Sequence, residues 1–366
     1  MFCILFPFLG GACSSESPVL TMLVGAYTSG NSAGIYSYRF NTEDLTIQPL
    51  SEATVDNASY LTFSPDAKFV YAVSESGRNS AVSALAFDKS AGTFRLLNRK
   101  EVANGPCYIF YHTLTRTVAT ANYNDGSVSI TNIEADGSLG EQQLLFKYEG
   151  LSINPSRQTS PHVHCVIEAP DQKALFATDL GTDKIHKIDV TIPPSGIKDI
   201  NTVFKESTSF DVEPGSGPRH LITNKKGTRA YLISELSGMA SVFAIDAGNK
   251  LTLLQTVLAD TLNAGGSADI HLSPDEKFLY TSTRIRGDGI VVFSVNTDGT
   301  LKRIGYQPTG RQPRNFAITP DGSSMLVACQ NGGMIMIFNI DKKTGLLTDT
   351  GKTIQVARPV CIRFVP

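Results

Sequence analysis

Residues 64–75 read SPDAKFVYAVSE, and residues 273–284 read SPDEKFLYTSTR, so a Pro-Asp turn followed by an apolar strand occurs twice almost letter for letter. Weaker copies have their turns at Thr113, Pro170, Lys225 and Pro320. From the first turn to the last, the five intervals cover 255 residues, or 51 on average. A repeat of about this length is typical of one blade of a β-propeller.

Each unit contains further strands. Alternating apolar segments such as residues 81–87 and 289–295 come after the turn, and a fourth segment such as residues 301–304 follows a Gly or Asp turn. Four antiparallel strands form one propeller blade. Apolar residues at helical spacing between helix caps are not evident, so few helices are expected and the predicted class is all-β.

The two ends of the chain complete a seventh unit. Residues 358–366 match the first strand of a unit and stop at the position of its turn, and residues 22–27 match the second strand. The sequence therefore predicts a seven-bladed β-propeller with four antiparallel strands per blade, closed by pairing of the N- and C-terminal strands. Residues 19–366 form this single domain, and ring closure removes exposed sheet edges.

Composition excludes several classes of function. The 366 residues include 32 Lys and Arg against 34 Asp and Glu, without a basic run, which disfavours nucleic-acid binding. The absence of Trp disfavours WD40 repeats. The six cysteines form no C-x-x-C pair or metal-type spacing, so neither a metal nor a cofactor is predicted. Those outside the leader lie in apolar strands and are expected to be buried thiols: Cys107, Cys165, Cys329 and Cys361.

Residues 1–18 resemble a bacterial lipoprotein signal. An apolar run up to Gly11, shorter than the roughly 20 residues of a membrane span, precedes Cys13 and small polar residues. Lipidation of Cys13 would attach the protein to a membrane in the cell envelope, which is the predicted location. No Lys or Arg precedes the run, and the alternatives are an incorrectly assigned start or a frayed terminus, with a cytoplasmic location.

The propeller topology predicts where the functional residues meet. The first strand of each blade lines the channel, and its start shares one face with the end of the antiparallel second strand. Four of the six histidines fall at first-strand starts, with two arginines and an aspartate: His162, His164, Arg219, His220, Asp269, His271 and Arg314. The second-strand ends include Glu75, Tyr123, Glu235, Arg284 and Gln330. Such a mouth suits an anionic, hydroxyl-rich small molecule because Arg binds carboxylate or phosphate bidentately.

Structural roles are alternatives for several of these residues. Arg219 and Glu235 are also compatible with a purely structural ion pair, and His271 with a core histidine between apolar neighbours. Asp179 is as compatible with capping a turn as with binding a ligand. The remaining candidates for ordinary rim groups are Glu75, Asn122, Tyr123 and Gln330, and His112 and His186 lie outside the predicted mouth. A G-x-S-x-G motif is absent from the sequence, so a serine nucleophile is not supported.

Motifs spread over the chain resemble those of a known family. They lie at residues 24–28, 160–164, 179–183, 217–220, 234–236, 268–275, 283–284 and 313–316. Together they resemble the lactonase seven-bladed propeller family, over nearly all of residues 21–366. That family includes bacterial 6-phosphogluconolactonases and fungal carboxymuconate lactonizing enzymes. Asp269 stands where members usually carry Glu, and Cys329-Gln330 where they carry Asn-Gln.

The resemblance implies a lactone hydrolase, foremost one that opens 6-phospho-D-glucono-1,5-lactone in the pentose phosphate pathway. The residues that the family uses in lactone chemistry map onto His164, Arg219, Glu235 and Arg284. Arg219 or Arg284 would stabilise the oxyanion, and Glu235 or His164 would activate water. Substrate binding is expected from His162, His220, Asp269, His271, Arg314 and Gln330, with Arg314 or His220 holding the phosphate.

Three alternatives remain open at this stage. Export would favour an unphosphorylated sugar lactone over a cytosolic phosphorylated one. A carboxymuconate cyclase would use similar groups to form a lactone. A non-catalytic ligand-binding propeller of the cell envelope is the third alternative, because fold does not imply function. The sequence makes no prediction about the oligomeric state.

Overall fold

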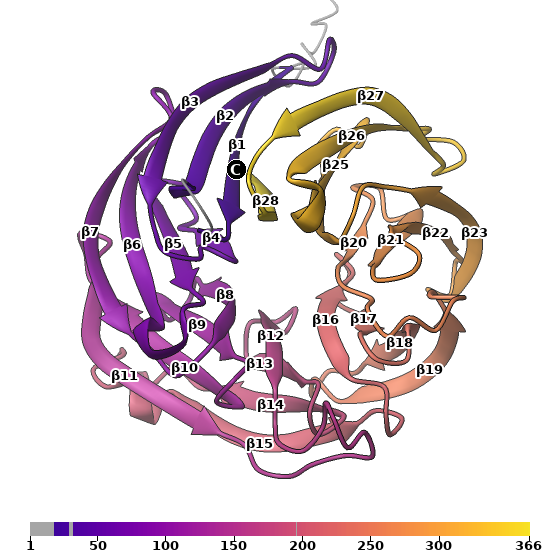
Figure 1. Cartoon of the computed structure of the whole chain (residues 1–366). Helices are drawn as coiled ribbons and strands as arrows, with labels where there is room; N and C mark the ends of the chain where they lie inside the picture. The colour runs from indigo at the N-terminus through magenta and orange to yellow at the C-terminus, as the bar shows by residue number, and fades with distance from the viewer. Residues whose placement is uncertain (1–17, 29–31, 195) are drawn as a thin grey trace, which may run out of the picture.

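The structure, a computed structural model, describes residues 18–28, 32–194 and 196–366. Seven four-stranded antiparallel sheets surround a central axis in these residues, as predicted (Figure 1). Residues 1–17 of the predicted signal segment, including Cys13, lie outside the residues that the structure describes. No helix in the described part of the chain is long and apolar enough to cross a membrane.

The strands occupy four concentric positions. The first strands, nearest the axis, are β4 (Leu61–Phe63), β8 (Pro106–His112), β12 (Val163–Glu168), β16 (Pro218–Thr223), β20 (Ile270–Leu272), β24 (Pro313–Ile318) and β28 (Pro359–Phe364). The second strands are β1 (Val19–Ala26), β5 (Phe69–Ser74), β9 (Thr117–Asn122), β13 (Ala174–Asp179), β17 (Arg229–Ser234), β21 (Phe278–Thr283) and β25 (Ser324–Cys329).

The third strands are β2 (Gly34–Asn41), β6 (Ala81–Asp88), β10 (Ser127–Ile133), β14 (Lys184–Val190), β18 (Met239–Ile245), β22 (Gly289–Val295) and β26 (Met334–Ile340). The outer strands are β3 (Ile47–Thr54), β7 (Thr93–Glu101), β11 (Leu139–Lys147), β15 (Phe204–Asp211), β19 (Leu251–Leu258), β23 (Leu301–Pro308) and β27 (Leu347–Gln355). Helical structure in the described residues is limited to three short 3₁₀ turns, η1 (Gly77–Asn79), η2 (Ile200–Thr202) and η3 (Gln330–Gly332).

The repeated sequence motif builds the turn between first and second strands. In the copy that begins at Ser64, the hydroxyl donates to Asp66 Oδ1 over 2.7 Å and accepts from the backbone N–H of Phe69 over 3.0 Å. The copy that begins at Ser273 makes the same two bonds, to Asp275 and from Phe278, at 2.7 and 3.0 Å. The motif recurs because the same side-chain bonds close the same turn.

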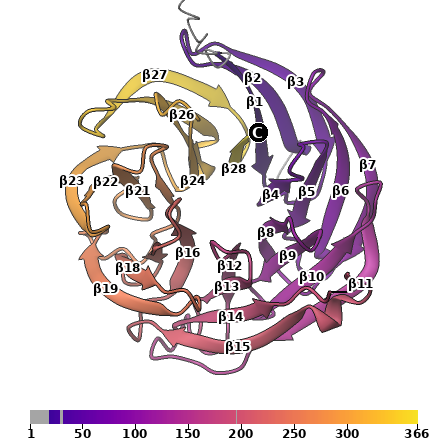
Figure 2. The ribbon, with the colours of Figure 1, turned by 180° about the vertical axis from the view of Figure 1, so that it is seen from behind.

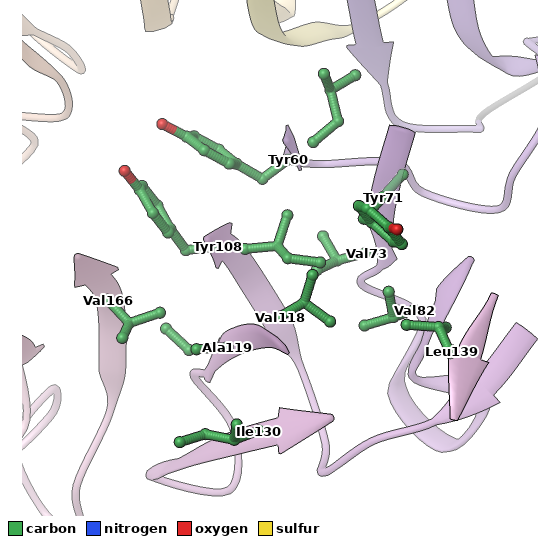
Figure 3. Packing of buried hydrophobic residues seen from close by; sticks show 14 of the residues in the cluster. Tyr60, Tyr71, Val73, Val82, Tyr108, Val118, Ala119, Ile130, Leu139 and Val166 are labelled. Carbon is green, nitrogen blue, oxygen red and sulfur yellow. The ribbon is translucent and has the colours of Figure 1, made fainter. Parts of the chain in front are cut away.

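Apolar side chains pack between neighbouring blades. Every residue of β9 is buried, whereas the outer strand β19 alternates between exposed and partly buried residues along most of its length. Figure 3 shows Val73 of one blade close to Val118 of the next, with Tyr71 beside Val73. The Tyr71 hydroxyl crosses the blade boundary and donates to the carbonyl of Gly137 over 3.0 Å. Second strands are therefore covered on both faces, which explains their continuous apolar sequences.

The chain ends close the ring as the sequence predicted. β28 pairs antiparallel with β1, with Met22 opposite Phe364 and Val24 opposite Ile362. Figures 1 and 2 both show the last strand beside the first, so one blade combines the two ends of the chain. Without β28, the inner edge of β1 would present unpaired backbone groups.

We expect deletion of residues 359–366 to abolish cooperative unfolding, because it removes the first strand of the closing blade and leaves the ring open. Far-UV circular dichroism and thermal unfolding measure this effect. The control removes only the exposed Pro366 and should unfold like the full chain. Cooperative unfolding of the longer deletion at the full-length midpoint would show that closure is dispensable.

Candidate functional site

β-Bulges occur near the start of four first strands. The register against the second strand shifts at Cys107, His164, Arg219 and Arg314, each the second residue of its first-strand start. A bulge inserts one unpaired residue and redirects its side chain. This explains how the consecutive residues Arg219 and His220 both take part in the same polar cluster.

Glu235 is the centre of that cluster. Its Oε2 lies 2.9 Å from Arg219 Nε and 3.2 Å from Arg284 Nη2. Its Oε1 accepts from Arg157 over 2.7 Å. Arg219 is almost completely buried, and Glu235 is 8% exposed. The ion pair that the sequence suggested is confirmed, and it is one side of a cluster with three guanidinium groups.

The surrounding charges determine the protonation of Glu235. Burial acts to raise its pKa, but the positive charges of Arg284 and Arg219 and the hydrogen bond from Arg157 outweigh this and lower the pKa to about 2. Glu235 is therefore a carboxylate at neutral pH. Because both oxygens already accept bonds from arginines, it is a weak base and a strong counter-ion.

Arg284 is held by backbone as well as by charge. Its Nε donates to the carbonyl of Gly266 over 2.7 Å, and burial lowers its pKa. Arg219 also donates to the carbonyl of Ala268 and lies 3.2 Å from His220 Nε2. Carbonyl oxygens and Glu235 thus fix both guanidinium groups before any ligand binds.

Two histidines beside the arginines are neutral at pH 7. Burial, together with the charge of Arg219, lowers the pKa of His220 to about 4 and holds the pKa of His164 well below its usual value. The His164 and His220 ring centroids are 5.2 Å apart. His164 Nδ1 lies 3.7 Å from Cys107 Sγ, and within the described residues its Nε2 makes no hydrogen bond. A neutral imidazole with one free nitrogen can accept a proton.

Asp269 anchors a second part of the network. It bonds His220 Nδ1 over 2.7 Å and His271 Nε2 over 3.0 Å, and it accepts from the Asn315 side chain over 2.6 Å. Burial acts to raise its pKa, but His271 and His220 hold the pKa well below its usual value. Asp269 thus orients His220, which in turn contacts Arg219.

Arg314 pairs with a second carboxylate of the mouth, Glu75. It lies 3.8 Å from Glu75 Oε2 and 5.6 Å from the ring centre of Tyr27, whose hydroxyl donates to Glu75 over 2.9 Å. Its charge also acts on Arg219 and His164. We call the following set the mouth cluster: Tyr27, Glu75, Tyr123, Arg157, His164, Arg219, His220, Glu235, Arg284 and Arg314.

The other predicted residues differ in how closely they join this cluster. The His162 ring stacks on Tyr123 at 4.5 Å between centroids and bonds the Tyr123 carbonyl over 2.9 Å, so it supports the wall of the mouth. His271 touches Asp269 and not the arginines of the cluster. The Gln330 side chain makes no hydrogen bond in the part of the chain that the structure describes, and Gln330 begins η3.

Sequence reasoning missed two members of the mouth cluster, Tyr27 and Arg157. Arg157 comes from the loop before β12, and it bridges Glu235 and the Tyr123 hydroxyl, the latter over 3.1 Å. It has no counterpart in the repeat, so the blade period gives no signal for it. Tyr123 and Glu75, considered possible rim groups, are members of the cluster.

Several residues outside the mouth cluster have structural roles. Asp179 accepts from the backbone N–H of His162 over 2.7 Å and of Gly181 over 2.9 Å, so it caps its turn. His112 is fully buried near Thr115, and His186 stacks on Tyr148. The four cysteines outside the leader are buried free thiols, as expected. No group of metal-binding side chains occurs among the described residues.

A family model described as lactonase, 7-bladed β-propeller, matches residues 21–364. The chain belongs to this family. The 6-phosphogluconolactonases of Formosa agariphila and Bacillus subtilis are 36% and 32% identical to it. The first alignment covers 89% of this chain and 94% of the relative, and the second covers 93% and 97%.

Solved structures agree with this family membership. A crystal structure from Bacteroides fragilis is 48% identical, with a TM-score of 0.90, over 96% of this chain and 99% of that chain. The periplasmic gluconolactonase of Pseudomonas aeruginosa is 33% identical, with a TM-score of 0.86, over 95% of this chain and 99% of that one. The lactonase-family resemblance read from the sequence motifs is confirmed.

We expect Glu235→Gln to destabilise this lactonase-family propeller by about 3–5 kcal/mol at pH 7, because it leaves buried guanidinium groups without their counter-charge. The carboxylate has its pKa lowered from 4.5 to about 2, so its contribution is present above pH 4.5 and is lost as the pH falls toward 2. Urea unfolding across this range should therefore show the gap between wild type and variant shrinking in acid. A gap that is independent of pH would contradict the charge assignment.

Proposed function

We propose that the protein is a lactone hydrolase that opens 6-phosphogluconolactone to 6-phosphogluconate at the mouth cluster. The observation that carries this proposal is the charge balance of the cluster, where four guanidinium groups face two carboxylates. The excess of positive charge favours an anionic substrate and an anionic transition state. The names of the two curated relatives support the choice of lactone.

We assign to Arg219 and Arg284 the stabilisation of the oxyanion that forms on the lactone carbonyl. Attack of water on the lactone carbonyl moves negative charge onto the carbonyl oxygen, and a preorganised donor is worth about 3 kcal/mol at such an atom. Both guanidinium groups are held by Glu235 and by backbone carbonyls, so little reorganisation is needed when the charge develops. Glu235 is therefore assigned to positioning the arginines.

His164 is the preferred general base, because both oxygens of Glu235 already accept bonds from arginines, whereas His164 Nε2 makes no hydrogen bond within the described residues. In this proposal His164 Nε2 takes the proton of the attacking water as the new C–O bond forms. The tetrahedral intermediate then collapses, the ring C–O bond breaks, and the same proton passes to the departing ring oxygen. Water is consumed, and a hydroxy acid is the product.

Arg314 is assigned to the phosphate. Its partner is Glu75 rather than Glu235, and Glu75 is 3.8 Å away, at the long end of ion-pair distances. A dianionic phosphate would compete well for this guanidinium. His162, His220, Asp269, His271 and Gln330 complete the proposed binding surface, with Asp269 orienting His220.

Gluconolactone without phosphate is the second candidate substrate, because the Pseudomonas aeruginosa neighbour is named a periplasmic gluconolactonase. Carboxymuconate cyclisation and ligand binding without turnover are the other outcomes to be tested. Hydrolysis of either lactone, cyclisation and binding alone all require an anionic or hydroxyl-rich ligand at the same mouth. Only a measurement of turnover therefore distinguishes these four functions.

We expect purified protein to hydrolyse 6-phosphogluconolactone faster than gluconolactone, after correction for spontaneous opening. Arg284→Met and His164→Gln should each lower kcat by about 100-fold or more, because they remove an oxyanion donor and the base. Arg314→Met should mainly raise KM, and only for the phosphorylated substrate. Arg95→Met is the matched control, since Arg95 is exposed on the outer strand β7.

Several results would overturn the proposal. Unchanged rates in Arg284→Met and His164→Gln would remove the site assignment. Lactone formation from carboxymuconate without phosphogluconolactone turnover would identify a cyclase. Saturable phosphogluconate binding with no turnover of any lactone would identify a binding protein.

We further propose attachment in the cell envelope through lipidated Cys13. Mass spectrometry of the protein from a host with lipoprotein processing should give a mature N-terminus at a lipid-modified Cys13. Cys13→Ser should abolish the modification. An intact N-terminus at Met1 in the native sequence would contradict envelope attachment and favour a cytoplasmic location.

A further inference from the structure

The loop that carries Arg157 is anchored by the next residue, Gln158. This loop joins β11 to β12 and contains neither helix nor strand among the described residues. Leu151 and Ile153 of the loop are each 69% exposed, whereas Gln158 is completely buried. A buried amide is costly unless its polar atoms are hydrogen-bonded, so the partners of Gln158 are the groups that fix the loop.

Both N–H groups of the Gln158 side chain have partners. Its Nε2 donates to the carbonyl of Leu180 over 2.9 Å and to Asp183 Oδ2 over 2.8 Å. Its Oε1 accepts from the backbone N–H of Asn154 over 3.1 Å, and its own backbone N–H donates to the Asn154 carbonyl over 2.9 Å. The side chain therefore ties the loop to itself and to the turn between β13 and β14.

Asp183 connects the loop to the segment just before β16. Asp183 is 3% exposed, and its carboxylate also accepts from the backbone N–H groups of Gly215 and Gly217, each over 2.7 Å. Within the described residues it pairs with no cation, so these N–H groups and Gln158 stabilise it. The carbonyl of Gly217 in turn accepts from the backbone N–H of Glu235 over 2.7 Å.

Gln158 and Asp183 thus hold the two partners of one ion pair from either side. Gln158 fixes the backbone next to Arg157, and Asp183 fixes the segment that bonds the backbone of Glu235. Neither side chain bonds a side chain of the mouth cluster. Their contacts are with the backbone that supports the Arg157–Glu235 contact of 2.7 Å.

The position of Arg157 matters because it is the partner of one oxygen of Glu235. Arg157 bonds Oε1, whereas Oε2 lies against Arg219 and Arg284. If Oε1 is released, the carboxylate can rotate, and Oε2 can move away from the two arginines assigned to the oxyanion. A misplacement of about 1 Å at a catalytic group can lower a rate by about 100-fold.

We propose, on the basis of the hydrolase function proposed above, that Gln158 and Asp183 are positioning residues that hold the Arg157–Glu235 ion pair in the geometry needed for lactone hydrolysis. They act through the loop and the backbone, and they do not touch the substrate. Their loss should lower kcat more than it raises KM, because the groups assigned to substrate binding stay in place.

Steady-state kinetics of Gln158→Met with 6-phosphogluconolactone test this role. Met has a similar length but cannot bond Asp183 or the Leu180 carbonyl, so kcat should fall by about tenfold, with KM changed by less than about twofold. Arg157→Met should lower kcat at least as much. The double variant should lose no more than Arg157→Met alone, because both changes act at one ion pair. Multiplication of the two losses would contradict the proposal.

Gln158→Glu adds a pH-dependent measurement. The introduced carboxylate repels Asp183, whereas its protonated form can donate to Asp183 Oδ2 in place of the amide. Burial next to Asp183 raises the pKa of the introduced group. The ratio of wild-type kcat to the kcat of this variant should therefore shrink severalfold between about pH 8 and about pH 5. A ratio that does not change with pH would contradict a role for the bond to Asp183.

Gln255→Met is the matched control. The Gln255 amide also bonds backbone, donating to the Leu301 carbonyl over 2.9 Å and accepting from the Leu301 N–H over 2.7 Å, but it lies on the outer strand β19. This change should lower the midpoint of thermal unfolding and leave kcat unchanged. An equal loss of kcat in Gln255→Met and Gln158→Met would identify a general effect of stability and overturn the positioning role.

A crystal structure of Gln158→Met separates this proposal from the hydrolase function. The Arg157 guanidinium should lie beyond ion-pair distance of Glu235, with the strands unchanged. If wild type hydrolyses no lactone, the hydrolase function fails, and this displacement would still establish that Gln158 positions Arg157. Retention of the Arg157–Glu235 contact would overturn the positioning role whatever the substrate. If Gln158→Met does not fold, Gln158→Glu serves for the same structure.

Discussion

Antiparallel pairing of β28 with β1 is the interaction on which the rest of the molecule depends. Each first strand belongs to a different blade, and only a closed ring brings the seven strand starts to one mouth. Closure also sets the narrow axis on which Tyr60 and His220 meet from opposite sides. Residues as far apart in sequence as Arg157 and Glu235 thereby form a single ion pair.

Within that ring, burial and charge set the protonation states of the mouth cluster. Several guanidinium groups in a buried space repel one another, and Glu235 compensates by accepting from three of them. Burial, together with these positive charges, lowers the pKa of His164 and of His220 and keeps both histidines neutral at pH 7. A fixed carboxylate, preorganised cations and a neutral imidazole are suited to the proposed hydrolysis of an ester.

The sequence predicted the architecture because the repeated turn has a local cause. Ser64 and Ser273 each close their turn with the same side-chain bonds, so the motif marks the blade period directly. Antiparallel geometry then placed the ends of the two inner strands at one face, and the contact of Arg219, Glu235 and Arg284 followed from it.

Other features have no local signal in the sequence. Arg157 lies in a loop outside the repeat, so its bond to Glu235 depends on the path of that loop. The bulge at Arg219 depends on pairing with the second strand and not on residue type. The protonation of Glu235 depends on which charges surround it in space, which is why the sequence alone left its choice as base open.

A crystal structure of the protein with 6-phosphogluconate, the product of the proposed reaction, tests the central claim most directly. The product carboxylate should lie within hydrogen-bond distance of Arg219 and Arg284, with His164 Nε2 facing it and the phosphate on Arg314. Density for the product elsewhere on the molecule, with the arginines around Glu235 unchanged and empty of ligand, would contradict the claim.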